Sequence, residues 1–271
     1  MEYSAENLCG SRMKKAEGNF SDTLGLLGIL PASRREWREG FLCVSTGVSI
    51  ADQNFVWGSP EGDPEEGVVR AVSFFQEEGV PFTWWISPST DSPEVRKALI
   101  RHGLKERCAP PAMALDLPPG AASEELPTTV TVRGAFSSED ARTWALCSLE
   151  GFSSGREHEE TFSAFAAGFL PEPFRQSFRL LTLLYGESPA ATALVSLTGE
   201  TAGLYFFSTV PAFRRKGLGR MLLSRCIEEA RASGVLPDDP SVLSRRLPLY
   251  LRAGFRDCFR FSVFSADPDA C

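Results

Sequence analysis

A strand, a loop rich in glycine and cations, and a helix follow one another directly in the last third of the chain. The apolar run 203–207 has the composition of a buried strand, and 218–233 carries apolar residues at helical spacing. The loop between them begins at Pro211, which stops strand pairing at that point. This strand–loop–helix unit predicts an α/β fold.

The loop itself has the composition of an anion site. Four cations and two glycines stand within 214–220, at the mouth of the helix. Glycines let the backbone approach a ligand closely, and the first turn of a helix offers unpaired N–H groups backed by the helix dipole. Arginine and lysine add charge-assisted bonds to phosphate. The sequence therefore predicts a ligand that carries a pyrophosphate, with a surface turn of solvated cations as the alternative.

Other ligand motifs are absent from the chain. A Walker loop needs G-x-x-x-x-G-K-[ST], which does not occur, and in a dinucleotide fingerprint a third glycine would stand where this chain has Leu222. The zinc motif H-E-x-x-H begins at His158, but Phe162 takes the place of its second histidine. We therefore expect no metal site.

Composition narrows the class of protein further. The chain has 271 residues, of which 43% are hydrophobic, enough for one large domain or two modest ones. No apolar run approaches the roughly 20 residues of a membrane span, and 1–20 lacks the apolar segment of a secretory signal. The seven cysteines are scattered without a C-x-x-C pair, and several stand in apolar contexts typical of small core residues, which indicates a reducing cytoplasm. The net charge of -7 arises entirely within 1–126, which disfavours a nucleic-acid binder.

The proline-rich stretch 118–127 is the predicted linker between two domains, 1–120 and 127–271. In the second domain, the patterns predict a regular order of strands and helices. These are a strand at 128–136, helices after 137 and at 157–169, strands at 179–185, 191–197 and 202–210, a helix at 218–233, a weak strand at 241–243, a short helix, and strands around 258–264.

Two features of this domain are similar to a known family. Arg214-x-x-Gly217-x-Gly219 resembles the R/Q-x-x-G-x-G/A signature of the GNAT superfamily of N-acetyltransferases, and the element order over 128–266 resembles the order in that family. The resemblance implies a GNAT fold with a mixed sheet in the C-terminal half, and acetyl-coenzyme A as cofactor. It also implies that pantetheine pairs with backbone groups of Ser208, Thr209 and Val210, and that the pyrophosphate lies against Arg214, Arg215, Lys216, Gly217, Leu218, Gly219 and Arg220.

The N-terminal half repeats part of this pattern. A helix at 66–78, an apolar strand at 81–87, and a helix before Gly103 match the order around Gly254 in the second half. The loop 60–67, however, holds four carboxylates where the second half has cations, and these would repel a pyrophosphate. We therefore predict a degenerate GNAT-like half that binds no cofactor, with two unrelated α/β pieces as the alternative.

Tyr250 is the candidate catalytic residue. It precedes Gly254-Phe255 by four residues and so resembles the GNAT tyrosine that lies near the sulfur of coenzyme A. The resemblance implies a general acid that protonates the departing thiolate, because a phenol with a pKa of about 10 can donate to a thiolate of about 8.5. The alternative is a core tyrosine that packs its ring and satisfies its hydroxyl.

The sequence does not identify the general base or the acceptor. Glu157, His158, Glu159 and Glu160 border the acceptor cleft in the family, and ordered water is the alternative base. We expect direct acetyl transfer to an amine of a small molecule or a protein, with no nucleic acid or membrane as partner and no prediction of oligomeric state. The alternatives are a non-catalytic acyl-coenzyme A sensor or interaction protein and, more weakly, a nucleotide-binding enzyme.

Overall fold

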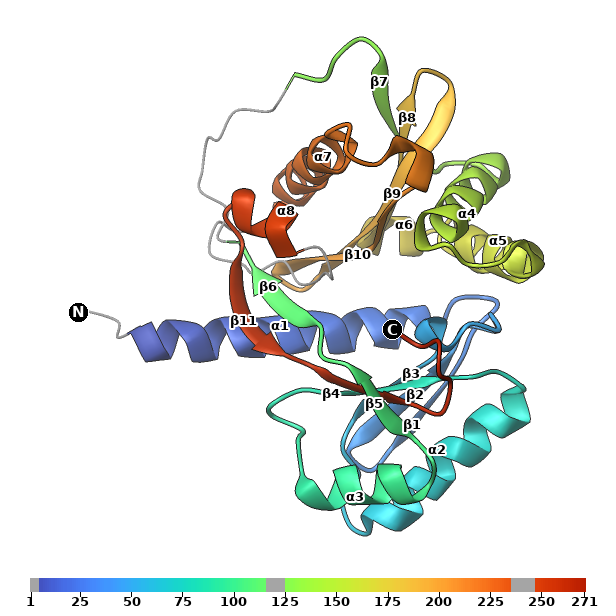
Figure 1. Cartoon of the computed structure of the whole chain (residues 1–271), viewed down its shortest axis with the longest axis vertical. Coiled ribbons are helices and arrows are strands. Elements are labelled where there is room, and N and C mark those ends of the chain that lie inside the picture. The colour runs from blue at the N-terminus through green and yellow to red at the C-terminus, as the bar shows by residue number, and fades with distance from the viewer. Residues whose placement is uncertain (1–4, 116–124, 235–246) are drawn as a thin grey trace. The chain divides into compact units, whose positions relative to one another are not determined.

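The computed structural model describes residues 5–115, 125–234 and 247–271 of the chain (Figure 1). These residues form two compact units, each built from two separate stretches. The first unit comprises Met1–Phe20 and Ala112–Cys258, and the second comprises Ser21–Pro111 and Phe259–Cys271. No helix in the described ranges combines the length and the apolar character that a membrane crossing requires.

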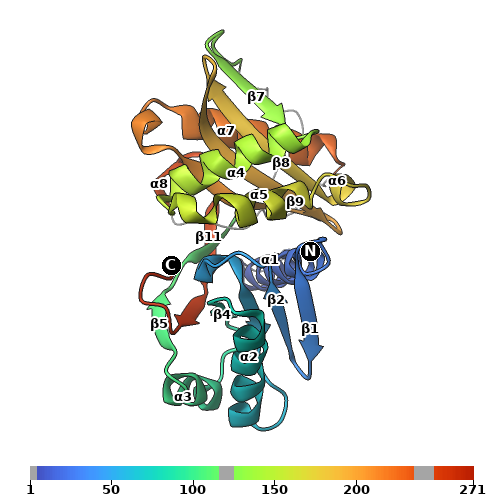
Figure 2. The ribbon, with the colours of Figure 1, turned by 90° about the vertical axis from the view of Figure 1, so that its right-hand side faces the viewer.

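The first unit is built on a four-stranded antiparallel sheet in the order β10-β9-β8-β7. Helices α4 and α5 cover one face of this sheet, and α7 covers the other (Figure 2). The elements that follow the predicted linker are β7 (Val130–Gly134), α4 (Ser138–Phe152), α5 (Glu159–Ala167), α6 (Phe174–Ser177), β8 (Phe178–Tyr185), β9 (Ser188–Thr198), β10 (Thr201–Thr209), α7 (Leu218–Ala232) and α8 (Leu247–Arg252).

Apolar side chains fill the space on both faces of this sheet. On one face, Leu222 and Leu223 of α7 are almost completely buried. On the other, Trp144 of α4 is fully buried, and its Nε1 donates to the Ala193 carbonyl of β9 at 3.0 Å. Burial of each such side chain contributes about 1.5–3 kcal/mol. The α/β fold class and these helices and strands are confirmed, whereas the predicted strand at 241–243 lies outside the described residues.

A long helix that the sequence patterns did not predict, α1 (Ala5–Leu27), precedes all of these elements. Asn19 in this helix is buried and donates to the hydroxyls of Thr198 and Thr201 at 2.7 and 3.0 Å. It also accepts a hydrogen bond of 2.7 Å from the Tyr205 hydroxyl. Because a buried amide must be satisfied, this network fixes the helix against β9 and β10.

The second unit holds a six-stranded mixed sheet in the order β1-β2-β3-β4-β12-β5. Only β3 and β4 pair in parallel, and the other pairs are antiparallel. Helices α2 and α3 pack together beside this sheet (Figure 1). The elements are β1 (Arg34–Arg38), β2 (Phe41–Ser45), β3 (Phe55–Gly58), α2 (Pro64–Glu78), β4 (Thr83–Ile86), α3 (Pro93–Arg101), β5 (Lys105–Cys108) and β12 (Ser262–Ser265).

The predicted repeat is visible in the way two helices end. Helix α3 ends before Gly103, which has a φ of +84°, and α8 ends before Gly254, which has a φ of +95°. In each copy, the residue after the glycine donates its N–H to the carbonyl five positions earlier, at 3.0 Å for Leu104 and 2.9 Å for Phe255. Both helices therefore end in the same glycine-dependent motif and lead into a strand.

The last strands of the two repeats are exchanged. Strand β6 (Pro111–Ala114) follows β5, and β12 follows β11 (Arg256–Arg260), so β6 and β12 hold equivalent places along the chain. Yet β6 pairs with β11, and β12 lies between β4 and β5. For this reason the compact units differ from the predicted domains 1–120 and 127–271, since each takes a segment from the other half of the chain.

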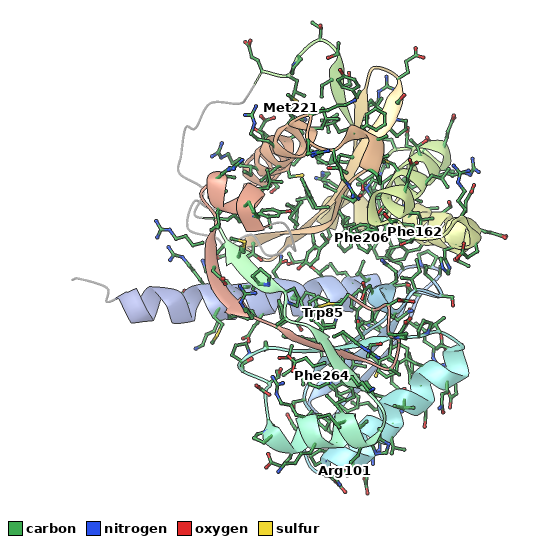
Figure 3. The ribbon with its side chains drawn as sticks, viewed as in Figure 1. Trp85, Arg101, Phe162, Phe206, Met221 and Phe264 are labelled. Carbon is green, nitrogen blue, oxygen red and sulfur yellow. A yellow bond between two sulfur atoms is a disulfide. The ribbon has the colours of Figure 1, made fainter. Side chains whose placement is uncertain are left out.

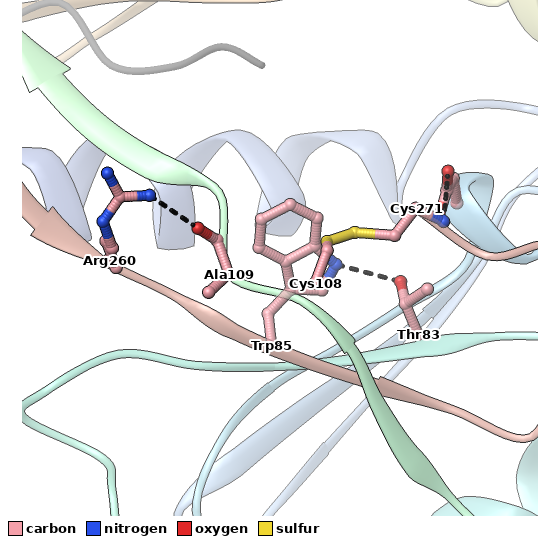
Figure 4. The surroundings of a disulfide bond; sticks show 7 residues. Thr83, Trp85, Cys108, Ala109, Arg260 and Cys271 are labelled. Atoms are coloured by element: carbon pink, nitrogen blue, oxygen red, sulfur yellow. Dashed lines mark hydrogen bonds between the residues drawn. A yellow bond between two sulfur atoms is a disulfide. The ribbon is translucent and has the colours of Figure 1, made fainter. Parts of the chain in front are cut away.

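A disulfide joins Cys108 of β5 to Cys271 (Figure 4). The Cys271 N–H also donates to both carboxylate oxygens of Asp52, at 2.9 and 3.0 Å. This pairing was not predicted from the scattered cysteines. Cys43, Cys147 and Cys226 are free and buried, as expected of small core residues.

Candidate functional site

Strand β10 contains a bulge just before the candidate site. The pairing with β9 shifts between Tyr205 and Ser208, so two residues of β10 lie opposite one residue of β9. Phe206 has a φ of +48° there, and its ring packs against Trp144 and Phe162, with centroids 5.6 and 6.1 Å away (Figure 3). Such a bulge bends a strand and re-aims the residues that follow it.

Beyond the bulge, one of the three predicted backbone partners faces away from β9. The Val210 N–H donates to the Ala190 carbonyl at 2.9 Å, so this N–H is not available to pair with pantetheine. Because hydrogen-bonded and non-bonded pairs alternate in an antiparallel ladder, Ser208 also faces β9 and Thr209 faces the open edge. In the described residues β10 is the edge of its sheet, and Thr209 offers its backbone N–H there.

Arg214 holds the loop in place. Its Nε donates to the Thr209 carbonyl and its Nη2 to the Gly151 carbonyl of α4, both at 2.9 Å. Gly151 in turn lies so close to β10 that an added Cβ would be 2.7 Å from the Ser208 Cβ. The predicted phosphate ligand Arg214 is thus tied to two carbonyls, which positions the loop after β10.

The N-terminus of α7 is open. Gly217 is the N-cap with a φ of +80°, no side chain caps the helix, and its first turn has no acidic residue. Within the part of the chain that the structure describes, the amide N–H groups of 215–219 donate to no acceptor. An uncapped helix end with several free amides binds anions through those amides and the helix dipole.

A buried hydroxyl lies beside this helix end. Thr209 is 2% exposed, and its Oγ1 has no hydrogen-bond partner among the described residues. A Cβ placed on Gly219 would lie 3.6 Å from that oxygen, so the hydroxyl faces the first turn of α7. Because a buried polar atom without a partner carries a desolvation cost, this hydroxyl points to a ligand at the helix end.

The remaining loop residues differ in the groups that they can present to a ligand. The Arg215 and Arg220 side chains are exposed, whereas Leu218 is 2% exposed and can offer only its N–H. The Lys216 Nζ lies 5.2 Å from the ring centroids of both Tyr185 and Phe213. Two aromatic rings therefore hold this ammonium group through cation–π contacts.

The equivalent helix of the other half is closed. Asp63 caps α2 and accepts a hydrogen bond from the Glu65 N–H at 3.0 Å, Pro64 occupies the first turn, and Glu66 adds a further carboxylate. The position that an anion would take at α7 is therefore filled in α2 by the chain's own carboxylate. Of these two helix ends, that of α7 is therefore the one open to an anion.

Tyr250 lies in the core of the first unit. It is fully buried, and its ring packs edge-on against Phe207 and Phe255, with centroids 5.9 and 5.2 Å away. The equivalent position of the other half, five residues before Leu104, is the buried Leu99. The copy of the motif in the N-terminal half therefore has no tyrosine at this position.

Of the four candidate bases, Glu159 and Glu160 begin α5, and Glu157 and His158 lie in the 3-10 turn just before it. Glu159 forms an ion pair with Arg142 of α4, and the His158 Nε2 lies 3.7 Å from Glu157. Glu160 is exposed. Burial raises the pKa of the Cys147 thiol in α4 to about 12, and this thiol is therefore no nucleophile near neutral pH.

The sequence around the candidate site is similar to a known protein family. Residues 134–237 match the family model described as an acetyltransferase (GNAT) domain, which includes α4, the bulged strand β10, the loop and α7. This part of the C-terminal half is therefore similar to GNAT acetyltransferase domains, as the resemblance implied. A search of curated proteins returns no matching sequence.

Solved structures share the fold over nearly the whole chain. A GCN5-related N-acetyltransferase from Kribbella flavida superposes with a TM-score of 0.64 at 17% identity, over 93% of this chain and 96% of its own. One from Sphaerobacter thermophilus gives 0.60 at 16%, over 95% and 90%. A tandem GNAT protein from the clavulanic acid biosynthesis pathway gives 0.54 at 15%, over 98% and 97%. The GNAT-type fold therefore extends through both halves.

Proposed function

We propose that the protein is an acetyl-coenzyme A-dependent N-acetyltransferase that transfers the acetyl group directly to an amine. The observation that carries the proposal is the open N-terminus of α7, where free amides, cations and the buried Thr209 hydroxyl converge. The residues fit a pyrophosphate, because they offer hydrogen-bond donors and positive charge and no carboxylate in the first helical turn.

Each part of the site would hold one part of the cofactor. The amides of 215–219, with Arg215 and Arg220, would bind the pyrophosphate. The Thr209 N–H at the open edge of β10 would pair with pantetheine as an added strand does. Acetyl-coenzyme A supplies the activated acetyl thioester. Ser208 would act only through its contact with Gly151, and Arg214 through its bonds to the loop base.

For the transfer itself, Tyr250 is proposed as the general acid that protonates the leaving thiolate. An attacking amine must also lose a proton, to a carboxylate, to His158 or to water. The acceptor would be a small-molecule amine or a protein amine, and the location would be the cytoplasm. The full burial of Tyr250 and the ion pair of Glu159 favour a second candidate, a non-catalytic acyl-coenzyme A sensor.

The loop assignment is tested by the double variant Gly217→Glu with Arg215→Ala, measured by calorimetry with acetyl-coenzyme A. The added carboxylate and the lost cation should abolish binding while the fold persists. Gly62→Glu is the matched control, because Gly62 also has a positive φ, of +100°, and free space around it, but precedes α2. Unchanged affinity in the double variant would refute the assignment.

A screen of amines with the wild-type protein separates the two functions. Release of coenzyme A with acetylation of any amine supports the transferase. Tight binding without turnover across small-molecule and peptide amines favours the sensor.

A further inference from the structure

We propose that Tyr185, Phe213 and Lys216 form a subsite for the adenosine 3′-phosphate end of the cofactor. This inference rests on the proposed function and deepens it, because it assigns residues to the part of the ligand beyond the pyrophosphate. Two of the three residues lie outside the amides and glycines of the phosphate loop. Tyr185 is the last residue of β8 and comes from a different element altogether.

The three side chains already form one cluster beside the loop. The ring centroids of Tyr185 and Phe213 are 6.1 Å apart, with an interplanar angle of 57°. The Lys216 ammonium lies 5.2 Å from both centroids. Because Lys216 directly precedes the N-cap Gly217, the cluster stands at the edge of the proposed pyrophosphate site.

The exposure of these rings suits a flat ligand. Tyr185 is 39% exposed at the end of the β8–β9 hairpin, and Phe213 is half-buried. An exposed aromatic ring at a strand end provides a stacking surface for a purine. A nucleotide bound by its pyrophosphate at the loop would have its purine near this ring.

The charge of Lys216 suits the 3′-phosphate. An ammonium held against aromatic rings has a fixed position, so less side-chain entropy is lost when it binds a phosphate. The adenine and the 3′-phosphate sit on the same ribose. One compact cluster with a ring and a cation therefore matches both groups at once.

The choice of ligand distinguishes the adenosine subsite from the pyrophosphate site at the loop. Three probes are compared by calorimetry: acetyl-coenzyme A, its 3′-dephospho form, and acetyl-4′-phosphopantetheine, which lacks the adenosine. Tyr185→Ala should weaken acetyl-coenzyme A binding by about fivefold or more, the lower end of the usual value of one base stack. It should leave acetyl-4′-phosphopantetheine binding unchanged, and Tyr185→Phe should restore wild-type affinity.

Lys216→Met should reduce the preference for acetyl-coenzyme A over the 3′-dephospho form. Phe136→Ala is the control, since Phe136 is 73% exposed in the same unit but lies two residues beyond the end of β7. Its affinities should equal those of the wild type. Thermal unfolding of each variant checks that the fold is retained.

Each other outcome overturns the inference in a recognisable way. If Tyr185→Ala weakens all three probes equally, or none, the ring does not contact adenine, and the subsite is wrong while the proposed function stands. If the wild type prefers none of the three probes but binds all, the subsite is again wrong. If the wild type binds none of them, the proposed function falls together with the subsite.

Discussion

Replacement of Gly151 by alanine tests whether the close approach of α4 to β10 positions the loop. Gly151 is the second-last residue of α4, and an added Cβ would lie 2.7 Å from the Ser208 Cβ, closer than real Cβ atoms come to one another. Either the helix or the strand must therefore shift. Ser208 directly precedes Thr209, whose carbonyl anchors Arg214, so any shift reaches the base of the loop.

The size of the effect follows from two opposed terms. Alanine gains about 0.5–1 kcal/mol over glycine inside a helix. Overpacking of a core costs about 1–3 kcal/mol. The net expectation for Gly151→Ala is a loss of up to about 2.5 kcal/mol in the free energy of unfolding. The affinity for acetyl-coenzyme A should fall as well, because Arg214 bonds to the Gly151 carbonyl.

Urea denaturation followed by circular dichroism measures the first effect, and calorimetry measures the second. Gly18→Ala in α1 is the matched control, because Gly18 is an exposed helical glycine with no atom within 4 Å of the added Cβ. This control should gain about 0.5–1 kcal/mol. If Gly151→Ala is stabilised as much as the control, the reasoning about the contact with Ser208 is refuted.

Three further predictions concern other parts of the first and second units. Tyr250→Phe should lower turnover far more than cofactor affinity, and equal turnover in steady-state assays would retire the general-acid role. Ser137→Ala removes the hydrogen bond that, more than any other contact, lowers the pKa of Asp140. At neutral pH this variant should lose about 1 kcal/mol in the free energy of unfolding. Because the pKa of Asp140 is lowered in the folded state, that loss should shrink as pH falls below 3.8, the pKa of Asp140 in the unfolded chain. A loss of constant size in urea denaturation between pH 7 and 2.5 would contradict this. In mass spectrometry after alkylation of the denatured chain, the two cysteines of Figure 4 should react only once reductant is added, and reaction without it would refute the disulfide.

Local patterns made the loop at 214–220 and the helix after it predictable from the sequence. The cations and glycines of 214–220 and the apolar face of α7 lie within one short stretch, and the structure keeps them together. The paired glycines Gly103 and Gly254 predicted the repeat for the same reason, because each ends a helix in a motif that needs a positive φ.

Non-local features could not be predicted in this way. Helix α1 was missed although Ala16, Phe20, Leu24 and Leu27 form a buried stripe, because its other residues are mostly polar and it contains glycines. The exchange of β6 and β12 has no local signal, since a strand's pattern does not name its partner.

Contacts between distant elements also limited what could be predicted about the candidate site. That the Val210 N–H bonds to β9 depends on where the bulge in β10 falls, and a bulge shifts the alternation of every later residue. That Arg214 supports the loop, and that Lys216 packs on rings, depends on carbonyls and aromatic residues from other elements.

The exchanged strands make the two repeats mutually dependent. A fragment that begins at the linker would lose β6, the partner of β11, and would carry β12 without the sheet into which it inserts. Neither repeat can therefore be cut out as a self-contained domain, or be lost by deletion while the other stays whole. Each half therefore has to be present for the strand pairing of the other half to be complete.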